Sequence, residues 1–355
     1  MTITRPCYCS RFDVARASDI KSTARSNDAI DRAIQSAADN IDGQMHRVFY
    51  PTDTTHYLDW PNFQRAYPWR IWLDQWELAD VTSNVPVLIS GGTTISSGDI
   101  FWGPWNYSPP YTFAELDRST SSSFGHGPTP QREISIKGTF GYSIATQTAG
   151  TLAANINGTT TTVTTSDGSL LGPGNVLIIG SERMLVTESS STDTTATLTS
   201  GGTTAVASDT SLTVSDGTKV NAGEVILIGS ERMLCYDVTG NVLTVKRAWD
   251  GTVLATHSPS DAIYAYRTWT VVRGVLGTTA ASATAGAAAT INQPPALIRD
   301  LAIAEASVQA RQELGLYSDP QGSGAGATKA IGSALAEKWV SAITAFGRKA
   351  RSRVV

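Results

Sequence analysis

The sequence contains one segment twice, as VLIIGSERMLV at residues 176–186 and as VILIGSERMLC at residues 225–235. An SDG tripeptide precedes each copy at the same distance, so the repeating unit has a period of 49 residues. Two explanations fit this repeat: a duplicated active site around the carboxylates of Glu182 and Glu231, or a duplicated piece of scaffold. In either case the chain folds one unit twice.

Each copy predicts a β-hairpin with a two-residue loop, at Gly180-Ser181 and at Gly229-Ser230. Glycine in the first loop position favours a type II′ turn, because that position needs a positive φ. The loop then sets the register of the strands. The predicted cross-strand pairs are Leu177 with Met184 and Ile226 with Met233.

Glu182 and Glu231 directly follow these turns, in the position where a polar residue closes a hairpin. Their neighbours Arg183 and Arg232 are expected on the opposite face of the strand. No His, Asp or Tyr recurs beside both glutamates to serve as a partner acid or base. We therefore interpret the repeat as a scaffold in which each glutamate contributes only about 0.5 kcal/mol through cross-strand contacts.

The composition favours β-structure and turns, since only 16% of the 355 residues are charged. A formal net charge of −4 argues against a surface that binds nucleic-acid phosphates tightly. No apolar run is long enough to cross a membrane, and no signal-peptide core is present, which predicts a soluble protein made in a cytoplasm. Cys7, Cys9 and Cys235 are expected to be free thiols, since the first two lie too close together for an unstrained bridge.

Helical periodicity flanks the β-rich sequence. Residues 26–46 predict an amphipathic helix with Ser26 as its N-cap. A shorter helix is expected to begin at Ser10, where Asp13 completes an acidic variant of the capping box. Another long helix follows the proline pair at residues 294–295 and should pack against the helix at 26–46.

We predict an α+β fold: a helical core with a small β-sheet, interrupted by an inserted all-β domain with a duplicated hairpin module, and ending in an extended C-terminal helical tail. Short strands between turns are expected over residues 51–142. The predicted domains are core helices and sheet at 1–146, the inserted domain at 147–290, a further core helix at 291–318, and a linker with the tail at 319–355.

Six of the nine tryptophans lie between residues 51 and 142: Trp60, Trp69, Trp72, Trp76, Trp102 and Trp105. We expect them to form the core and rim of the small sheet. The alternative is an aromatic platform for sugars or bases.

No motif points to catalysis, a cofactor or a metal. The four histidines are scattered, without HExxH or CxxC spacing. The segment GSGAGATK at residues 322–329 superficially resembles a phosphate-binding loop, but no strand leads into it and Lys329 is misplaced, so it is interpreted as a linker. The sequence therefore indicates an assembly protein and not an enzyme.

The stretch SDIKSTARSNDAIDRAIQSAADNIDGQMHRVFYP, followed by WRIWLDQWELADVTS, VPVLISGGTTI and REISIKGTFGY, resembles the head-to-tail adaptor (connector) proteins of long-tailed bacteriophages of actinobacterial hosts. The later PPALIRDLAIAEASVQARQELGL is similar to the helix that follows the GTFGY strand in that family. The resemblance covers residues 10–146 and 290–320, so the repeat-containing segment looks like an insertion.

The resemblance implies a ring of twelve copies under the portal protein in the phage neck of the virion, after synthesis in the host cytoplasm. It implies the portal, the next neck or tail-completion protein and other copies of the chain as partners, with double-stranded DNA passing through the lumen without tight binding. The capsid is a further candidate partner for the insert. An acidic chain agrees with a channel that does not hold DNA.

The C-terminal segment is the predicted portal-binding site. It combines an apolar stripe with a cluster of basic residues: Ile331, Leu335, Trp339, Ile343, Phe346, Arg348, Lys349, Arg351 and Arg353. The Gly-rich linker before it would let it reach another chain. The alternative is that the segment folds back on its own subunit.

Two other functional hypotheses remain open at this point. One is a phage decoration or adhesion module that binds a host glycan through the Thr/Ser-rich β-domain. The other is a cell-wall hydrolase that uses Glu182 or Glu231.

Overall fold

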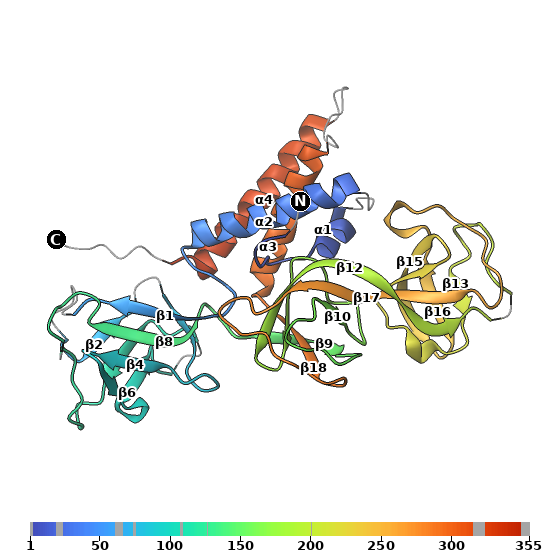
Figure 1. Cartoon of the computed structure of the whole chain (residues 1–355). Helices are drawn as coiled ribbons and strands as arrows, with labels where there is room; N and C mark the ends of the chain where they lie inside the picture. Colours follow the sequence, from blue (N-terminus) through green and yellow to red (C-terminus); the bar gives the residue numbers. More distant parts are fainter. Residues whose placement is uncertain are drawn as a thin grey trace.

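The computed structural model describes residues 3–18, 24–60, 67–73, 76–106, 109–125, 127–199, 201–314 and 324–348. Strands account for 36% of the chain and helices for 22%. The described elements form three antiparallel sheets and a group of four helices (Figure 1). The predicted fold class, a helical core with a small sheet and an extended helical tail, is therefore wrong. Short strands between turns leave a weaker sequence signal than helical periodicity, so the sequence pattern indicates less β-structure than the fold contains.

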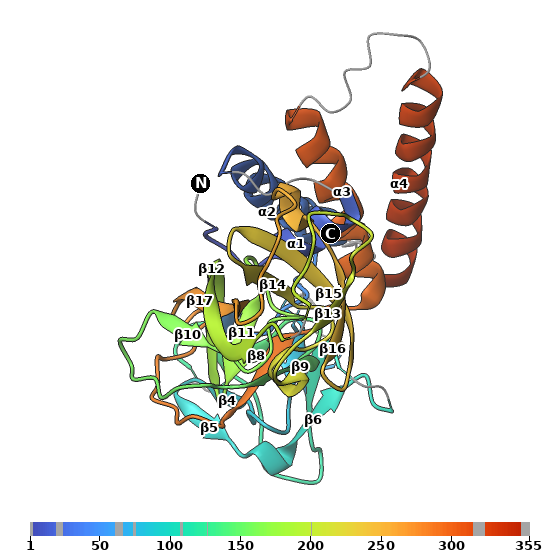
Figure 2. The same cartoon turned by 90° about the vertical axis from the view of Figure 1, so that its right-hand side faces the viewer.

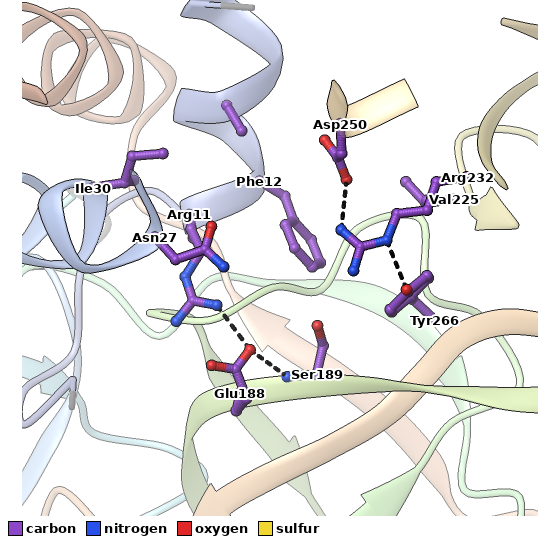
Figure 3. A pocket seen from close by; sticks show the side chains of 11 residues that line it. Arg11, Phe12, Asn27, Ile30, Glu188, Ser189, Val225, Arg232, Asp250 and Tyr266 are labelled. Atoms are coloured by element: carbon purple, nitrogen blue, oxygen red, sulfur yellow. Dashed lines mark hydrogen bonds and ion pairs between the residues drawn. The ribbon is translucent and has the colours of Figure 1, made fainter. Parts of the chain in front are cut away.

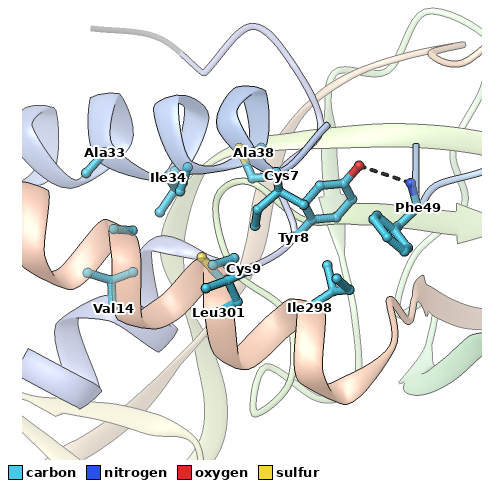
Figure 4. Close-up of a cluster of buried hydrophobic side chains, with 14 of the residues drawn as sticks. Cys7, Tyr8, Cys9, Val14, Ala33, Ile34, Ala38, Phe49, Ile298 and Leu301 are labelled. Atoms are coloured by element: carbon cyan, nitrogen blue, oxygen red, sulfur yellow. Dashed lines mark hydrogen bonds between the residues drawn. The ribbon is translucent and has the colours of Figure 1, made fainter. Parts of the chain in front are cut away.

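The helices are α1 (Arg11–Ser18), α2 (Ala24–Met45), α3 (Ala296–Glu313) and α4 (Gly324–Phe346). α2 and α3 pack together, as predicted, across a core that includes Ile34, Ile298 and Leu301 (Figure 4). The N-terminal segment lies over the same core, where the hydroxyl of buried Tyr8 accepts a hydrogen bond of 3.0 Å from the Phe49 amide.

The capping box at the start of α1 is confirmed. The Ser10 amide donates to the Asp13 carboxylate at 2.9 Å, and the Asp13 amide donates to Ser10 Oγ at 3.1 Å. These bonds satisfy amides that have no partner within the helix, which explains why the helix begins there.

α4 turns back along α3 and does not extend away from the subunit (Figure 2). Leu335, Trp339 and Phe346 pack against the core of the helical unit, and the Phe346 ring meets the Phe49 ring edge-on at a centroid distance of 5.8 Å. Burial of these side chains removes apolar surface from water, which favours the folded-back position. The predicted extended tail is thus the fourth helix of the helical unit.

Two small sheets follow α2. The five-stranded sheet has the order β1 (Thr52–Leu58), β8 (Ile134–Phe140), β4 (Val87–Ser90) and β5 (Thr93–Ile95), with β3 (Leu78–Asp80) also paired to β8. The three-stranded sheet has the order β2 (Arg70–Trp72), β7 (Phe113–Leu116) and β6 (Ile100–Gly103). A short 3-10 turn, η1 (Ser97–Asp99), leads into β6.

The two small sheets share a core made mainly of Ile and Leu side chains. None of the six tryptophans of this region is fully buried. Trp60, Trp69 and Trp102 pack against the margin of the core, whereas Trp76 is 42% and Trp105 is 50% exposed. The tryptophans therefore form the rim, and their predicted place in the core is wrong because branched aliphatic side chains fill it.

The ten-stranded sheet has the order β13-β16-β15-β14-β17-β12-β11-β18-β9, with β10 paired to β17. Its strands are β9 (Thr146–Thr151), β10 (Thr162–Thr164), β11 (Val176–Ile179), β12 (Glu182–Thr197), β13 (Ser211–Thr213), β14 (Val225–Ile228), β15 (Glu231–Thr239), β16 (Val242–Lys246), β17 (Ala262–Val272) and β18 (Ala288–Asn292). The 3-10 turns η2 (Gly217–Lys219) and η3 (Trp249–Gly251) lie between them.

This sheet consists of two equivalent modules, one nested inside the other. Module 1 comprises β9, β10, β11, β18, the first half of β12 and the second half of β17. Module 2 comprises β13, β14, β15, β16, the second half of β12 and the first half of β17. In module 2, β15 and β16 are joined by a tight turn at Gly240-Asn241, whereas in module 1 the corresponding strands β12 and β17 are joined by the whole of module 2 (Figure 1).

The strand pairing demonstrates the equivalence. In module 1, Leu177 pairs with Ile291, and in module 2 Ile226 pairs with Ala265. The β10–β17 and β13–β16 pairs correspond in the same way. Each module has its own core, with Trp269 fully buried in module 1.

The predicted hairpin register is confirmed in both modules. Leu177 pairs with Met184 and Ile226 pairs with Met233. Gly180 and Gly229 have φ values of 60° and 57°, in the region of backbone conformation that residues other than glycine rarely adopt. The Gly-Ser loops thus set the register locally.

Candidate functional site

The repeated glutamate of module 1 forms a buried ion pair with an arginine that lies 91 residues later. Arg273 Nε and Nη2 donate to the two oxygens of Glu182 at 2.6 and 2.7 Å. The Gly274 and Ala281 amides donate to the same carboxylate at 3.1 and 2.9 Å. The glutamate therefore closes a loop that leaves β17 and returns to β18.

Module 2 repeats this arrangement bond for bond. Arg247 Nε and Nη2 each donate to Glu231 at 2.8 Å. The Ala248 and Ala255 amides donate to it at 2.9 and 3.0 Å. We call each set, the glutamate, its arginine and the two amides, a glutamate clamp.

The remaining donors of both arginines bind backbone carbonyls. Arg273 Nη1 reaches the carbonyls of Asn157 and Thr160, and Arg247 Nη1 reaches those of Thr204 and Asp209. Each clamp thus joins three separate loops of its module. Planar bidentate pairing makes this cross-link both strong and directional.

The modest cross-strand role expected for Glu182 and Glu231 is wrong. Their side chains are 1% and 0% exposed, so each is a central group of its module and not a surface residue that closes a hairpin. Burial by itself raises the pKa of Glu231, but hydrogen bonds from Arg247, the two amides and His257 outweigh it and lower the pKa to about 2. The pKa of Glu182 is lowered by the same balance of burial against hydrogen bonds.

A second sequence signal marks the clamp, at a different spacing. Arg273 begins RGVLGTTAA and Arg247 begins RAWDGTVLA, which share the pattern Arg-x-x-x-Gly-Thr-x-x-Ala. These copies are 26 residues apart, whereas the hairpin copies are 49 residues apart, because module 2 lies inside module 1. A search at one fixed period therefore misses the arginines.

The clamps differ at one position. His257 Nε2 lies 3.0 Å from Glu231 Oε2, whereas the equivalent residue of module 1 is Ala283. His257 is 4% exposed, and its Nδ1 lies 3.8 Å from the Asp261 carboxylate. Glu231 therefore makes five hydrogen bonds to four residues, two of them to Arg247.

Both clamp carboxylates are fully engaged, and this decides what they can do chemically. A general acid needs a raised pKa, and a nucleophile needs a lone pair exposed to substrate. Glu231 and Glu182 have lowered pKa values and are closed off from solvent. The geometry supports a structural role for both.

Within the described part of the chain, no group of three or more His, Cys, Asp or Glu side chains could hold a metal ion. None of the described helices is long and apolar enough to cross a membrane. The three cysteines are free and buried.

A cavity of about 70 Å³ lies where α1 and α2 meet the two modules (Figure 3). Arg11 donates to Glu188 at 2.7 Å on one side of it. On the other side, Arg232 donates to the Tyr266 hydroxyl at 2.8 Å and lies 3.6 Å from the Asp250 carboxylate. The ion pair between Arg11 and Glu188 joins the helical unit to module 1 on one side of the cavity, and the contacts of Arg232 on the other side lie within module 2.

The predicted portal-binding residues occupy different environments. Leu335, Trp339 and Phe346 contact the helical core, and Ile343 is 43% exposed. The Arg348 amide donates to the Met45 carbonyl at 3.1 Å, and its guanidinium lies 3.3 Å from buried Glu77. The side chain of Ile331 and all of Lys349, Arg351 and Arg353 lie outside the described part of the structure.

Leu335, Trp339 and Phe346 of the predicted portal-binding site therefore lie together against the helical core of their own subunit. The predicted turn residues Gly180, Ser181, Gly229 and Ser230 lie at the hairpin loops.

No family model matches the chain, and no match was found among curated proteins or solved structures.

Proposed function

We propose that this chain is a structural head-to-tail adaptor of a phage neck. It forms a ring of twelve copies under the portal protein, completes the DNA channel and provides the docking surface for the next neck or tail protein. DNA passes through the lumen without tight binding, and the ten-stranded sheet lies at the periphery, within reach of the capsid.

One observation carries the proposal. The two stretches that resemble neck adaptors, residues 10–146 and 290–320, are separated in the sequence, but their described helices α1, α2 and α3 pack into one unit. The Asn40 amide of α2 donates to Glu305 of α3 at 2.8 Å, and Arg299 of α3 donates to Asp13 of α1 at 2.9 Å. This packing supports an adaptor-like core into which the ten-stranded sheet is inserted.

The use of the acidic groups also supports an assembly role. The two repeated glutamates are the only catalytic candidates in the sequence, and both carboxylates are bound by an arginine within the glutamate clamps. A hydrolase that uses Glu182 or Glu231 is therefore not favoured, because neither group can reach a substrate.

Because α4 folds back on its own subunit, only its outer face is free to contact the portal. Its inner face is occupied by the helical core, whereas Val340 and Ile343 on its outer face are 65% and 43% exposed. In this proposal the outer face contacts the portal while the inner face holds α4 on its own subunit. Aromatic and aliphatic side chains at the centre of an interface contribute most of its free energy.

The test is co-sedimentation and electron microscopy of the purified chain with portal rings. We expect a closed ring on the portal, and loss of that ring for the double variant Val340→Asp/Ile343→Asp. The matched control is Val242→Asp on β16, which is 37% exposed and distant in sequence. Equal binding by all three proteins would exclude α4 as the dock, and failure of the unaltered chain to bind any portal ring would overturn the adaptor function.

A further inference from the structure

The outer face of the three-stranded sheet carries an ordered array of aromatic side chains. The strand register aligns two rows on this face: Arg70, Glu115 and Phe101, then Trp72, Phe113 and Gly103. The alternate residues Ile71 and Ala114 are fully buried in the core on the other face. Because side chains alternate along a strand, this outer set faces away from the core.

A shallow hollow of about 430 Å³ opens on this face. Its lining consists of Trp69, Phe101, Trp105, Glu115, Leu116 and Arg118. Phe101 is 48% exposed and Trp105 is 50% exposed. Clusters of exposed aromatic rings are uncommon on surfaces without a binding partner, because apolar surface left in water does not contribute the favourable free energy of burial.

The aromatic side chains of this face are held in place by packing around the Phe113 ring. Gly103 leaves room for the Phe113 ring, which lies where a side chain at residue 103 would be. Trp105 meets Phe113 edge-on at 6.0 Å, and the Arg70 guanidinium lies 4.4 Å from the Phe113 centroid. Side chains held in this way lose little conformational entropy when a ligand binds.

The two arginines beside the hollow are both engaged by neighbouring side chains. Arg70 forms an ion pair with Glu115, which is 6% exposed. The Arg118 guanidinium lies 4.3 Å from the centroid of the Trp69 ring. A polyanion such as a nucleic acid needs uncompensated positive charge for its phosphates, and the chain has a formal net charge of −4.

The ligand that fits is flat, neutral, apolar on one face and polar at its edge. A pyranose ring has these properties: its C–H face packs on the electron-rich face of an indole or phenyl ring, and its hydroxyls bind planar charged groups at the margin. Arg118 and Glu115 lie at the hollow and have the required hydrogen-bonding groups.

We infer that the outer face of the β2-β7-β6 sheet is a binding site for a neutral oligosaccharide, stacked on Phe101 and Trp105. This site is separate from the Thr/Ser-rich ten-stranded sheet and does not depend on the neck-adaptor function. On a virion, it would add weak attachment to a carbohydrate-covered surface, and many copies in a ring would strengthen that attachment through multivalency.

The experiment titrates the full chain with four neutral tetrasaccharides, built from α-glucose, β-glucose, mannose and galactose, and follows tryptophan fluorescence and calorimetry. We expect saturable binding of at least one sugar at concentrations up to about 10 mM. Trp105→Ala and Phe101→Ala should each weaken that binding about tenfold, as loss of a central aromatic contact does. Trp105→Phe should retain part of it.

The matched control is Trp76→Ala, which removes another exposed tryptophan, stacked on His56 and outside the hollow. This variant should bind the sugar like the unaltered protein, and thermal unfolding should show that all variants remain folded. The inference is overturned if none of the four sugars binds saturably, if Trp105→Ala binds unchanged, or if a proline-rich peptide binds at the hollow in preference to every sugar.

Discussion

Glu231 and Arg247 form a two-point ion pair in which both guanidinium-to-carboxylate distances are 2.8 Å and neither side chain is more than 1% exposed. Glu182 and Arg273 form the equivalent pair in module 1. A buried pair of this kind is strongly destabilising to break, because the remaining charge has no solvent around it. The clamps therefore make each module sensitive to the loss of a single carboxylate.

Glu231→Gln and Glu182→Gln should each reduce the free energy of unfolding by about 2–4 kcal/mol, because a neutral amide leaves a buried guanidinium uncompensated. Urea unfolding followed by circular dichroism measures this change. Glu337→Gln on the exposed surface of α4 is the matched control and should have little effect. Clamp variants as stable as this control would contradict the structural role of the clamps.

The stability of module 2 should depend on pH in the acid range. The pKa of Glu231 is lowered from 4.5 to about 2 in the folded protein. A lowered pKa stabilises the fold above the unfolded-state value, and that contribution is lost as pH falls from about 4.5 toward about 2. The difference in unfolding free energy between the unaltered chain and Glu231→Gln should therefore shrink over this range. A difference that stays constant from pH 6 to about pH 2.5 would show that the carboxylate charge contributes nothing.

Module 2 should be removable without unfolding module 1. Ser190 and Thr268 are directly paired across β12 and β17, at the positions that Thr239 and Val242 occupy in module 2. Replacement of residues 191–267 by Gly-Asn, the turn that module 2 uses itself, should leave a folded module 1 in which Trp269 stays buried. Near-ultraviolet circular dichroism and limited proteolysis measure this.

The control variant replaces residues 191–266, one residue fewer, by the same Gly-Asn pair. A two-residue loop at Gly-Asn then pairs Ser190 with Arg267 instead of Thr268, which shifts the strand register by one residue. A shift of one residue reverses which side chains face the core, so this variant should be much less stable than the matched deletion. If both deletions are equally unfolded, module 2 is an integral part of the core of module 1.

Gly180→Val should weaken the module 1 hairpin by about 1–2 kcal/mol, because a β-branched residue does not tolerate a positive φ. Gly180 has φ 60°, and apart from its two chain neighbours no atom lies within 4 Å of a Cβ added there, so the substitution tests mainly the backbone conformation. Proteolysis near the loop and thermal unfolding give the readout. Gly43→Ala within α2 also enters open space, but at a helical position, and should not destabilise the protein. Unchanged protease resistance in Gly180→Val would refute the turn assignment.

Trp339→Ala should reduce the free energy of unfolding by about 2 kcal/mol, because the indole packs against the helical core. Val340→Ser, on the next residue but 65% exposed, is the control and should change stability little. Thermal unfolding distinguishes the two. Equal stabilities would mean that α4 is held only weakly on its subunit.

The local features of this protein follow from residues that are close together in the sequence. The Gly-Ser loops determine the hairpin register, because a two-residue loop allows one pairing of the flanking strands. The capping box at Ser10 determines where α1 begins, and the periodicity after the proline pair determines α3. In each case the residues that decide the structure lie within a few positions of one another.

The role of the repeated glutamates, the nesting of the modules and the direction of α4 depend instead on how distant segments pack. Glu182 and its partner Arg273 are 91 residues apart, and the hairpin that connects them is interrupted by module 2. The apolar face of α4 could serve another chain or its own, and its position depends on which apolar surface is free to receive it. Burial and ion pairing depend on distances in space, and a linear sequence does not contain those distances until the strands and helices have packed.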